Sequence, residues 1–390
     1  MLINKLFLLA LSVVFLSGCS RDKGKTEIKA ELSEAGYFYS LSDYSQDSIF
    51  LSAYNFVRNI YRPEKDDFVD LFSERLKEED PEIRLAAFFS TFKLKDKINY
   101  TSTNQQVIDI VKEEIKEGLE ETILILKGRI IAACEKAHFP GSLFDRPAVE
   151  VISMPERNSY LFTVNRATDH ARMIKQLESP GDFGIWATYP FEDLRYYMAN
   201  AYVPVSDSLF FSMINPPHLD FSKKETVNKL GVFSLEDTAD VNRHFSRPDV
   251  RDFLPRDLKT AWEINPSENS RDSMTLVLIK ISTLDKSAPI NGNCINRVSV
   301  NETETGSGII IEMNEYYTRI LSRLTYENLG RHLAILIDNT VYYNLYIDQE
   351  TENGLFKIPG SYTYREAEDQ SIILSSGSFP QYSVKIKEIN

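Results

Sequence analysis

The stretch that decides the fold class is residues 324–347, LTYENLGRHLAILIDNTVYYNLYI. Its first residues complete a helical apolar pattern, and Gly330 is a typical helix stop because the left-handed conformation costs glycine nothing. Residues 333–337 and 341–347 are two strand-like runs on either side of Asp338-Asn339, a pair that favours a tight hairpin turn. A helix that leads directly into a hairpin predicts an α+β fold.

The pattern extends to both sides of this stretch. Residues 308–313 predict a strand before it and residues 355–358 a strand after it. Thr363 and Glu366 have the spacing of a capping box, which predicts the start of a helix that carries Ala367 and Ile373. The polar surroundings of Gly306-Ser307-Gly308 predict a turn. We therefore assign residues 285–380 to one α+β head subdomain and residues 381–390 to a terminal strand that returns to the rest of the fold.

The N-terminal half predicts a second α+β subdomain, over residues 28–190. Apolar residues recur every three or four positions over residues 103–137, which indicates one long helix. The other expected elements are a strand at 37–41, helices at 68–76 and from Pro81, strands at 148–154, 160–164 and 183–189, and a helix around Ile174. The resulting βαββαβ order is that of a ferredoxin-like base subdomain. Residues 191–284 form a connecting region with one buried strand at 274–281.

The first twenty residues, MLINKLFLLALSVVFLSGCS, have the pattern of a bacterial lipoprotein leader. Lys5 precedes a short apolar run, and small residues lead to Cys19, whose thiol would accept the lipid. An ordinary signal peptide with a chance cysteine is the alternative. We assign residues 1–18 to the signal peptide and residues 19–27 to a tether, and expect a membrane lipoprotein of the cell envelope that faces the periplasm. No later stretch approaches 18 apolar residues, so no transmembrane helix is expected.

Composition excludes several functions. The formal charge of −13 argues against nucleic-acid binding, because neutralising phosphates requires the opposite sign. The five histidines have no metal-ligand spacing, and no nucleophile elbow, P-loop or dinucleotide motif occurs. We therefore expect no catalytic residue, metal or cofactor, and no enzyme activity. An oxidising compartment would permit a bond between Cys134 and Cys294, but a buried thiol in the helical stripe at Cys134 is the more common outcome.

Several strings resemble, in the same order, the first periplasmic domain of the SecD/SecDF protein-export subunit. The strongest are residues 324–339, residues 360–369 (GSYTYREAED) and residues 374–380 (LSSGSFP). Weaker similarity covers residues 126–189, and residues 237–262 are similar to an insertion in longer fused forms. The similarity extends over nearly all of residues 28–390.

The resemblance implies a base and a head subdomain that bind unfolded or translocating polypeptide, beside Sec translocon components. Without membrane helices, this chain would not pump by itself. The candidate polypeptide-binding residues are aromatic side chains near the head hairpin: Tyr342, Tyr343, Tyr346 and Phe356. Alternate members of this set could instead fill the core. The alternative function is an envelope scaffold or accessory lipoprotein that binds other envelope proteins and has no role in export.

Overall fold

The computed structural model describes residues 25–43, 47–136, 148–154, 158–165, 169–191, 193–194, 228–252, 254–263, 273–282, 287–303 and 306–389. Cys19 and the rest of the expected leader lie outside these residues. The chain divides into two compact units. Unit 1 comprises Met1–Leu32, Leu126–Glu178 and Val384–Asn390, and unit 2 comprises Ser33–Ile125 and Ser179–Ser383. Within the described part of the chain, no helix is both long enough and apolar enough to span a membrane.

Unit 1 is built around a four-stranded antiparallel sheet. Its strand order is β14 (Val384–Ile389), β1 (Thr26–Leu32), β3 (Ser159–Val164) and β2 (Val149–Ser153). The end of the long helix α5 (Asn104–Lys136) and α6 (His170–Glu178) complete the unit. Arg129 of α5 is fully buried, and its guanidinium donates to the carbonyl of Gln176 in α6 at 3.0 Å. The chain order β1-α5-β2-β3-α6-β14 is the expected βαββαβ arrangement.

The first and last strands of this arrangement are not the ones that the sequence predicted. Residues 37–41 are helical, and the first strand is β1, which begins at Thr26 inside the expected tether. Its side chains alternate between buried and half-buried, as one covered sheet face requires. The strand at 183–187, β4 (Phe183–Ala187), pairs with β11 and β8 in unit 2. The fourth strand of the ferredoxin-like sheet is β14, from the far end of the chain.

Unit 2 begins with a layer of helices that follows β1 and precedes α5 in the sequence. It consists of α2 (Glu34–Leu41), α3 (Ser48–Ile60), α4 (Phe68–Glu79) and the short 3₁₀ helix η1 (Leu85–Phe88). Side chains of Ser33, Asp47 and Asp67 cap the first three helices. The helix expected from Pro81 is wrong, because the chain turns there and only η1 forms. Phe38 lies at the centre of the layer, with ring centroids of four other phenylalanines between 4.6 and 5.8 Å from its own.

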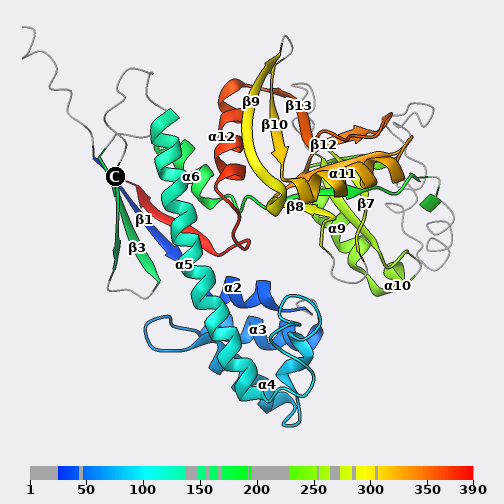
Figure 1. Cartoon of the computed structure of the whole chain (residues 1–390). Coiled ribbons are helices and arrows are strands. Elements are labelled where there is room, and N and C mark those ends of the chain that lie inside the picture. The colour runs from blue at the N-terminus through cyan, green and yellow to red at the C-terminus, as the bar shows by residue number, and fades with distance from the viewer. Residues whose placement is uncertain are drawn as a thin grey trace, which may run out of the picture. The chain divides into compact units, whose positions relative to one another are not determined.

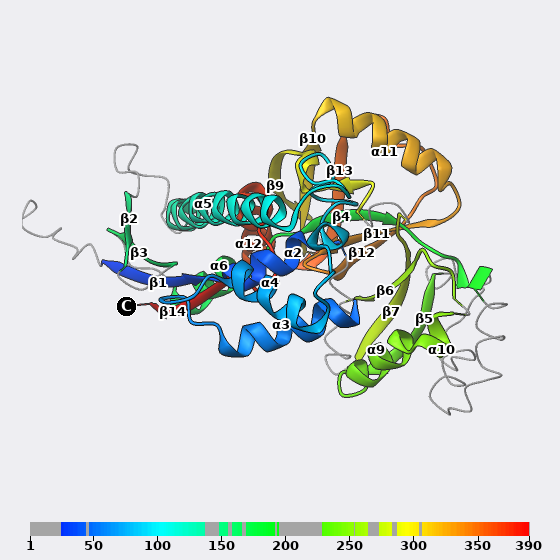
Figure 2. The same ribbon diagram turned by 90° about the horizontal axis from the view of Figure 1, so that it is seen from below.

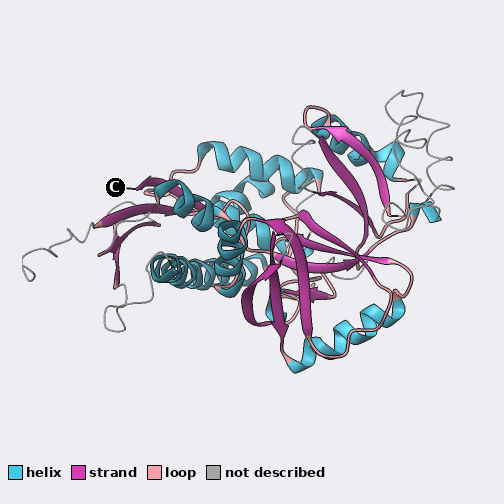
Figure 3. Ribbon diagram, turned by 90° about the horizontal axis from the view of Figure 1, so that it is seen from above, coloured by secondary structure: helices cyan, strands magenta, loops and turns pink. Residues whose placement is uncertain are grey.

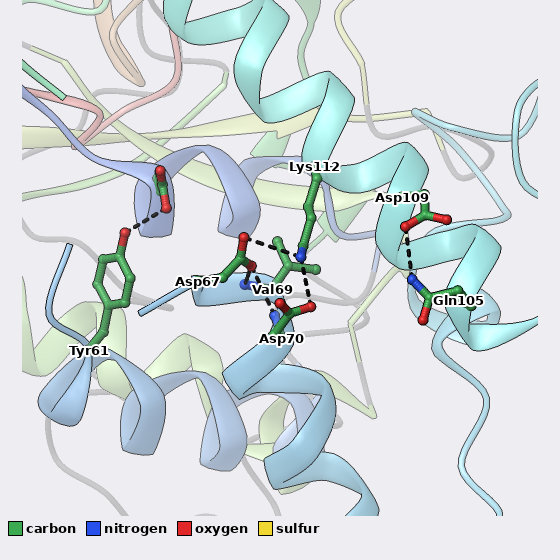
Figure 4. A network of polar contacts seen from close by, with 8 residues as sticks. Tyr61, Asp67, Val69, Asp70, Gln105, Asp109 and Lys112 are labelled. Carbon is green, nitrogen blue, oxygen red and sulfur yellow. Dashed lines mark hydrogen bonds and ion pairs between the residues drawn. The ribbon is translucent and has the colours of Figure 1, made fainter. Parts of the chain in front are cut away.

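A polar network ties α4 to α5 within this layer (Figure 4). Lys112 of α5 contacts the carboxylates of Asp67 at 3.2 Å and Asp70 at 2.7 Å, and Asp67 also caps α4. Desolvation favours the neutral form of Lys112, but the hydrogen bonds to Asp70 and Asp67 outweigh it and raise the pKa of the ammonium. The network therefore joins the start of α4 to α5 through the charged ammonium of Lys112.

The main sheet of unit 2 has seven strands in the order β5-β7-β6-β12-β11-β4-β8. Their bounds are β5 (Lys229–Ser234), β6 (Leu258–Glu263), β7 (Ser273–Lys280), β8 (Ile290–Asn291), β11 (His332–Ile337) and β12 (Thr340–Tyr346). Helices α9 (Thr238–Ser246) and α10 (Pro248–Arg251) pack on the end formed by β5, β6 and β7 (Figure 2). The expected strands at 274–281, 333–337 and 341–347 are confirmed.

A smaller sheet, β13-β10-β9, shares a core with the main sheet. It contains β9 (Ile295–Thr303), β10 (Gly306–Met313) and β13 (Leu355–Tyr362), and it is accompanied by α11 (Glu315–Glu327) and α12 (Tyr364–Ser375). The capping box of Thr363 and Glu366 is confirmed. The turn expected at Gly306–Gly308 is wrong, because these residues open β10 and pair with β9. Figure 3 shows helices packed beside strands throughout, and the α+β class is confirmed.

Candidate functional site

The four aromatic candidates lie in the head, but the structure places them in different surroundings. Phe356 of β13 is buried in the core shared by the two sheets. Tyr342 and Tyr343 are half-buried and pack against the same core, because an irregularity in register places Tyr342 as an extra residue between two paired positions. Tyr346, also half-buried, pairs with His332 across the hairpin. The set therefore does not form one continuous exposed patch.

Tyr342 and Tyr362 form a hydrogen-bonded pair beside α12. The Tyr362 hydroxyl donates to the Tyr342 carbonyl at 3.3 Å, and Gln370 of α12 donates to the Tyr342 hydroxyl at 3.0 Å. Burial raises the pKa of both phenols. These contacts tie β12, β13 and α12 together, so Tyr342 has a structural role in the head in addition to any contact with a ligand.

A buried polar cluster surrounds His332 at the start of β11. Its ring lies edge-on to Tyr346 at 5.3 Å, and its carbonyl accepts from the Thr188 hydroxyl at 2.9 Å. Lys229, on β5, forms an ion pair with Glu263 at 2.7 Å. Burial, and secondarily the charge of Lys229, lower the pKa of His332 to about 4. The imidazole is therefore neutral in the folded protein near neutral pH.

This shift predicts a loss of stability in mild acid. Below the ordinary histidine pKa of about 6.5, the unfolded chain binds a proton that folded His332 rejects until about pH 4. The stability contribution is complete above pH 6.5, and about 2 kcal/mol of it should be lost between pH 7.5 and 5. Denaturant unfolding at both pH values measures the loss. A His332→Gln variant should show a smaller loss, whereas His170→Gln, at an exposed position, should keep the full one. If both variants lost the same amount of stability between pH 7.5 and 5, His332 would not be the group responsible.

Sequence reasoning missed a polar pocket at the tip of the β11–β12 hairpin. The pocket has a volume of about 350 Å³. It is lined by residues from five separate chain segments: Ser40, Lys93, Pro180, Asp182, Asp338, Asn339, Ser378, Phe379, Pro380 and Gln381. Two of the strings that resemble the export family, residues 324–339 and 374–380, end here. Only the turn propensity of Asp338-Asn339 pointed to this place, and both residues do have positive φ, at 52° and 62°.

Opposite charges face one another in this hairpin-tip pocket. Burial raises the pKa of Asp182, and neighbouring Asp338 adds to the rise. Burial lowers the pKa of Lys93 and of Lys259, which Asp182 partly offsets in each case. Lys259 also donates to the Asn339 side chain at 3.0 Å. Positive and negative groups from four chain segments therefore lie near the hairpin turn.

Asp338, in the hairpin turn, makes hydrogen bonds to the chain segment that precedes β4. Its carboxylate accepts from the Asp182 N–H at 2.8 Å and from the Ser179 hydroxyl, and its own N–H donates to the Asp182 carbonyl at 2.8 Å. An Asp338→Ala variant should lose about 1–2 kcal/mol of stability, because the half-buried Ser179 hydroxyl and the Asp182 N–H lose their acceptor and alanine tolerates positive φ poorly. Asp338→Asn keeps an acceptor and the turn preference, so its loss in denaturant unfolding should be clearly smaller. Wild-type stability in the alanine variant would contradict this role.

A second hollow, the β13 groove, lies between the end of β12 and the start of β13. It has a volume of about 470 Å³ and is lined by Leu345, Gln349, Glu350, Thr351, Glu352, Asn353, Leu355, Phe356 and Lys357. Strand β13 is the last strand of its sheet and pairs with β10 alone among the described strands. This groove contains one of the four aromatic candidates, Phe356, and it runs beside an open strand edge.

The described residues contain no cluster of three or more side chains suited to a metal ion. Cys134 and Cys294 are buried and are not joined by a disulfide. Burial raises the pKa of Cys294 to about 12, so its thiol is protonated and unreactive at neutral pH. The other features of the described head are sheet edges, half-buried aromatic rings and two polar hollows.

Comparison with known proteins defines the class. Residues 273–381 match the family model of the SecDF P1 head subdomain. The protein translocase subunit SecD of Rhodothermus marinus is 30% identical over 151 residues, which is 38% of this chain and 24% of that protein. SecD of Calditerrivibrio nitroreducens is 35% identical over 80 residues, or 20% of this chain and 15% of that protein. These matches show that residues 273–381 are similar to the head subdomain of a protein-export subunit.

More particularly, the similarity to SecD and SecDF is concentrated in residues 273–381, the part that matches the P1 head. Solved SecDF structures are also similar. One, described as SecDF in a super-membrane-facing form, is 15% identical with a TM-score of 0.38, covering 87% of this chain and 34% of that one. Another, of a SecDF membrane component that enhances protein export, is 14% identical with a TM-score of 0.37, covering 70% and 93%. The matched part spans a quarter or less of the length of the two SecD relatives.

Proposed function

We propose that this chain faces the periplasm and binds unfolded or translocating polypeptide through its head, in association with the protein-export machinery. The observation that supports this most is the match of residues 273–381 to the SecDF P1 head. Binding rather than catalysis fits the chemistry, because the buried thiol of Cys294 is protonated and the charged groups at the hairpin tip are engaged in holding the fold together.

Strand addition is the mode that suits an extended polypeptide. An extended chain can hydrogen-bond to an open sheet edge through its backbone, which gives affinity with little dependence on sequence. The head offers such an edge at β13, and Tyr343 and Tyr346 lie half-buried on the neighbouring β12. Aromatic rings beside an open edge can cover alternate side chains of the incoming strand.

The test measures whether the purified chain delays aggregation of an unfolded protein. The proposal expects a concentration-dependent delay, together with crosslinks from a photoreactive residue at position 346 to the unfolded substrate. A Tyr346→Ser variant, which changes a half-buried side chain and keeps strand β12, should shorten the delay. No delay and no crosslink would reject polypeptide binding and favour the alternative of an envelope scaffold that binds folded envelope proteins.

We propose in addition that the chain is held at the membrane by lipid on Cys19. The support is the leader pattern, in which small residues precede the cysteine directly after the apolar run. Mass spectrometry of protein produced in bacteria should find a mature N-terminus at Cys19 with acyl chains attached. A Cys19→Ser variant should be released from the membrane fraction, and an unmodified thiol in the mature wild type would contradict the anchor.

A further inference from the structure

The β13 groove has a fixed shape because the connection between β12 and β13 is tied down on several sides. The Thr351 N–H donates to the Thr325 hydroxyl at 3.0 Å, and Ser322 of α11 hydrogen-bonds to Glu350. Gly354 has a φ of 65°, and an added Cβ would lie 2.3 Å from the Thr318 hydroxyl oxygen. A groove built in this way exists before a ligand arrives, which lowers the entropic cost of binding.

The groove also presents a short length of open backbone. The Leu355 N–H donates to the Asn353 side chain at 3.1 Å and therefore turns away from β10. Because strand residues alternate in direction, the backbone groups of Lys357 face the same open side. Pro359 has no N–H and ends this length of edge, as prolines do on protected edge strands. Only a short extended segment can pair here.

The side chains around the edge define the chemistry of the occupant. Leu355 is 44% exposed and lies in register opposite Glu312 of β10. The connection before β13 carries three acidic residues within five positions, Asp348, Glu350 and Glu352. Of these acidic residues, Glu350 and Glu352 line the groove together with one ammonium, that of Lys357, while Arg297 lies one strand further away opposite Glu312. An apolar side chain with positive neighbours would complement this groove.

We propose that the β13 groove selects extended polypeptide segments in which an apolar residue is flanked by lysine or arginine. The proposal deepens the proposed function, on which it rests, by naming the class of segment that the head takes. The incoming backbone pairs with the Leu355 carbonyl and with Lys357, its apolar side chain covers Leu355, and its positive side chains lie against Glu350 and Glu352. The segment adds to the edge of β13 as a short further strand.

Short fluorescent peptides test this selectivity with the whole purified chain. One peptide alternates valine with lysine, a second carries glutamate in place of lysine, and a third is the lysine peptide with alternate backbone nitrogens methylated. At low ionic strength the lysine peptide should bind about tenfold more tightly than the glutamate peptide, and added salt should narrow the difference. Methylation removes the backbone donors and should weaken binding about tenfold.

Two pairs of variants locate the effect. The Glu350→Gln/Glu352→Gln double variant should weaken binding of the lysine peptide about threefold or more, whereas Glu74→Gln/Glu82→Gln makes the same change in net charge on the helical layer and should leave it unchanged. Leu355→Lys should weaken binding of the lysine peptide, because it places a positive charge in the groove. Leu329→Lys alters a residue of nearly equal exposure, 45%, outside the groove lining and should have no comparable effect.

The outcomes separate the groove from the general function. Equal affinity for the lysine and glutamate peptides, insensitivity to methylation, or equal effects of the two double variants would overturn the selectivity of the groove. If no peptide binds while an unfolded protein still does, the groove is also rejected and the proposed function stands. If neither the peptides nor an unfolded protein binds, both proposals fail.

Discussion

Replacing Phe38 by alanine is expected to give the largest loss of stability of any single substitution considered, about 3–5 kcal/mol. The Phe38 side chain is fully buried, and its ring contacts those of Phe50, Phe68, Phe72 and Phe89. These rings come from α2, α3, α4 and the segment after η1. The substitution therefore leaves a cavity where the whole helical layer meets, and rigid neighbouring rings cannot collapse to fill it.

Denaturant unfolding of the purified chain measures this loss. The matched control is Phe56→Ala on α3, where the ring is 46% exposed and is covered on one side by the Arg75 guanidinium at 4.6 Å. That variant should lose about 1 kcal/mol or less. Similar losses in the two variants would mean that Phe38 is not the centre of the layer.

The second large effect is expected from Gly118→Ala in α5. A Cβ at this position would lie 2.5 Å from the Tyr37 ring, whose hydroxyl donates to the Gly118 carbonyl at 2.7 Å and contacts Thr122. The clash should cost about 2 kcal/mol or more, in spite of the better helix propensity of alanine. Gly118 is thus required for the close approach of α2 to α5.

Gly128→Ala provides the control in the same helix. Nothing lies within 4 Å of an added Cβ there, so this variant should gain up to about 1 kcal/mol from helix propensity. A Tyr37→Leu change combined with Gly118→Ala should recover part of the loss, because it removes the aromatic atoms that clash. If Gly118→Ala and Gly128→Ala changed stability in the same direction, the close contact between the Tyr37 ring and Gly118 would be contradicted.

Local chemistry allowed much of the head to be predicted. Aspartate and asparagine tolerate the left-handed conformation, so Asp338-Asn339 marked the hairpin turn, and their φ values are positive. Gly330 has a φ of 76° in the turn that follows the end of α11 at Glu327, and Thr363 with Glu366 starts α12. Each of these signals depends on a few neighbouring residues, which is why the sequence alone contains it.

The errors came from pairings that are distant in sequence. β1 has a charged residue at alternate positions and becomes a strand because β3 and β14 flank it, and β14 lies at the other end of the chain. The aromatic run at residues 37–41 resembles a strand, but the Ser33 cap and the surrounding rings make it helical. The hairpin-tip pocket gathers five separate segments, so no local motif could have indicated it.

Amide hydrogen exchange tests the central claim, that the head binds extended polypeptide, most directly. The purified chain is measured alone, with a permanently unfolded polypeptide, and with the same polypeptide in its folded form. Strand addition should slow exchange at residues 355–357 and in the neighbouring β12 only in the presence of the unfolded form. Unchanged exchange throughout the head, or equal slowing by the folded form, would contradict the claim.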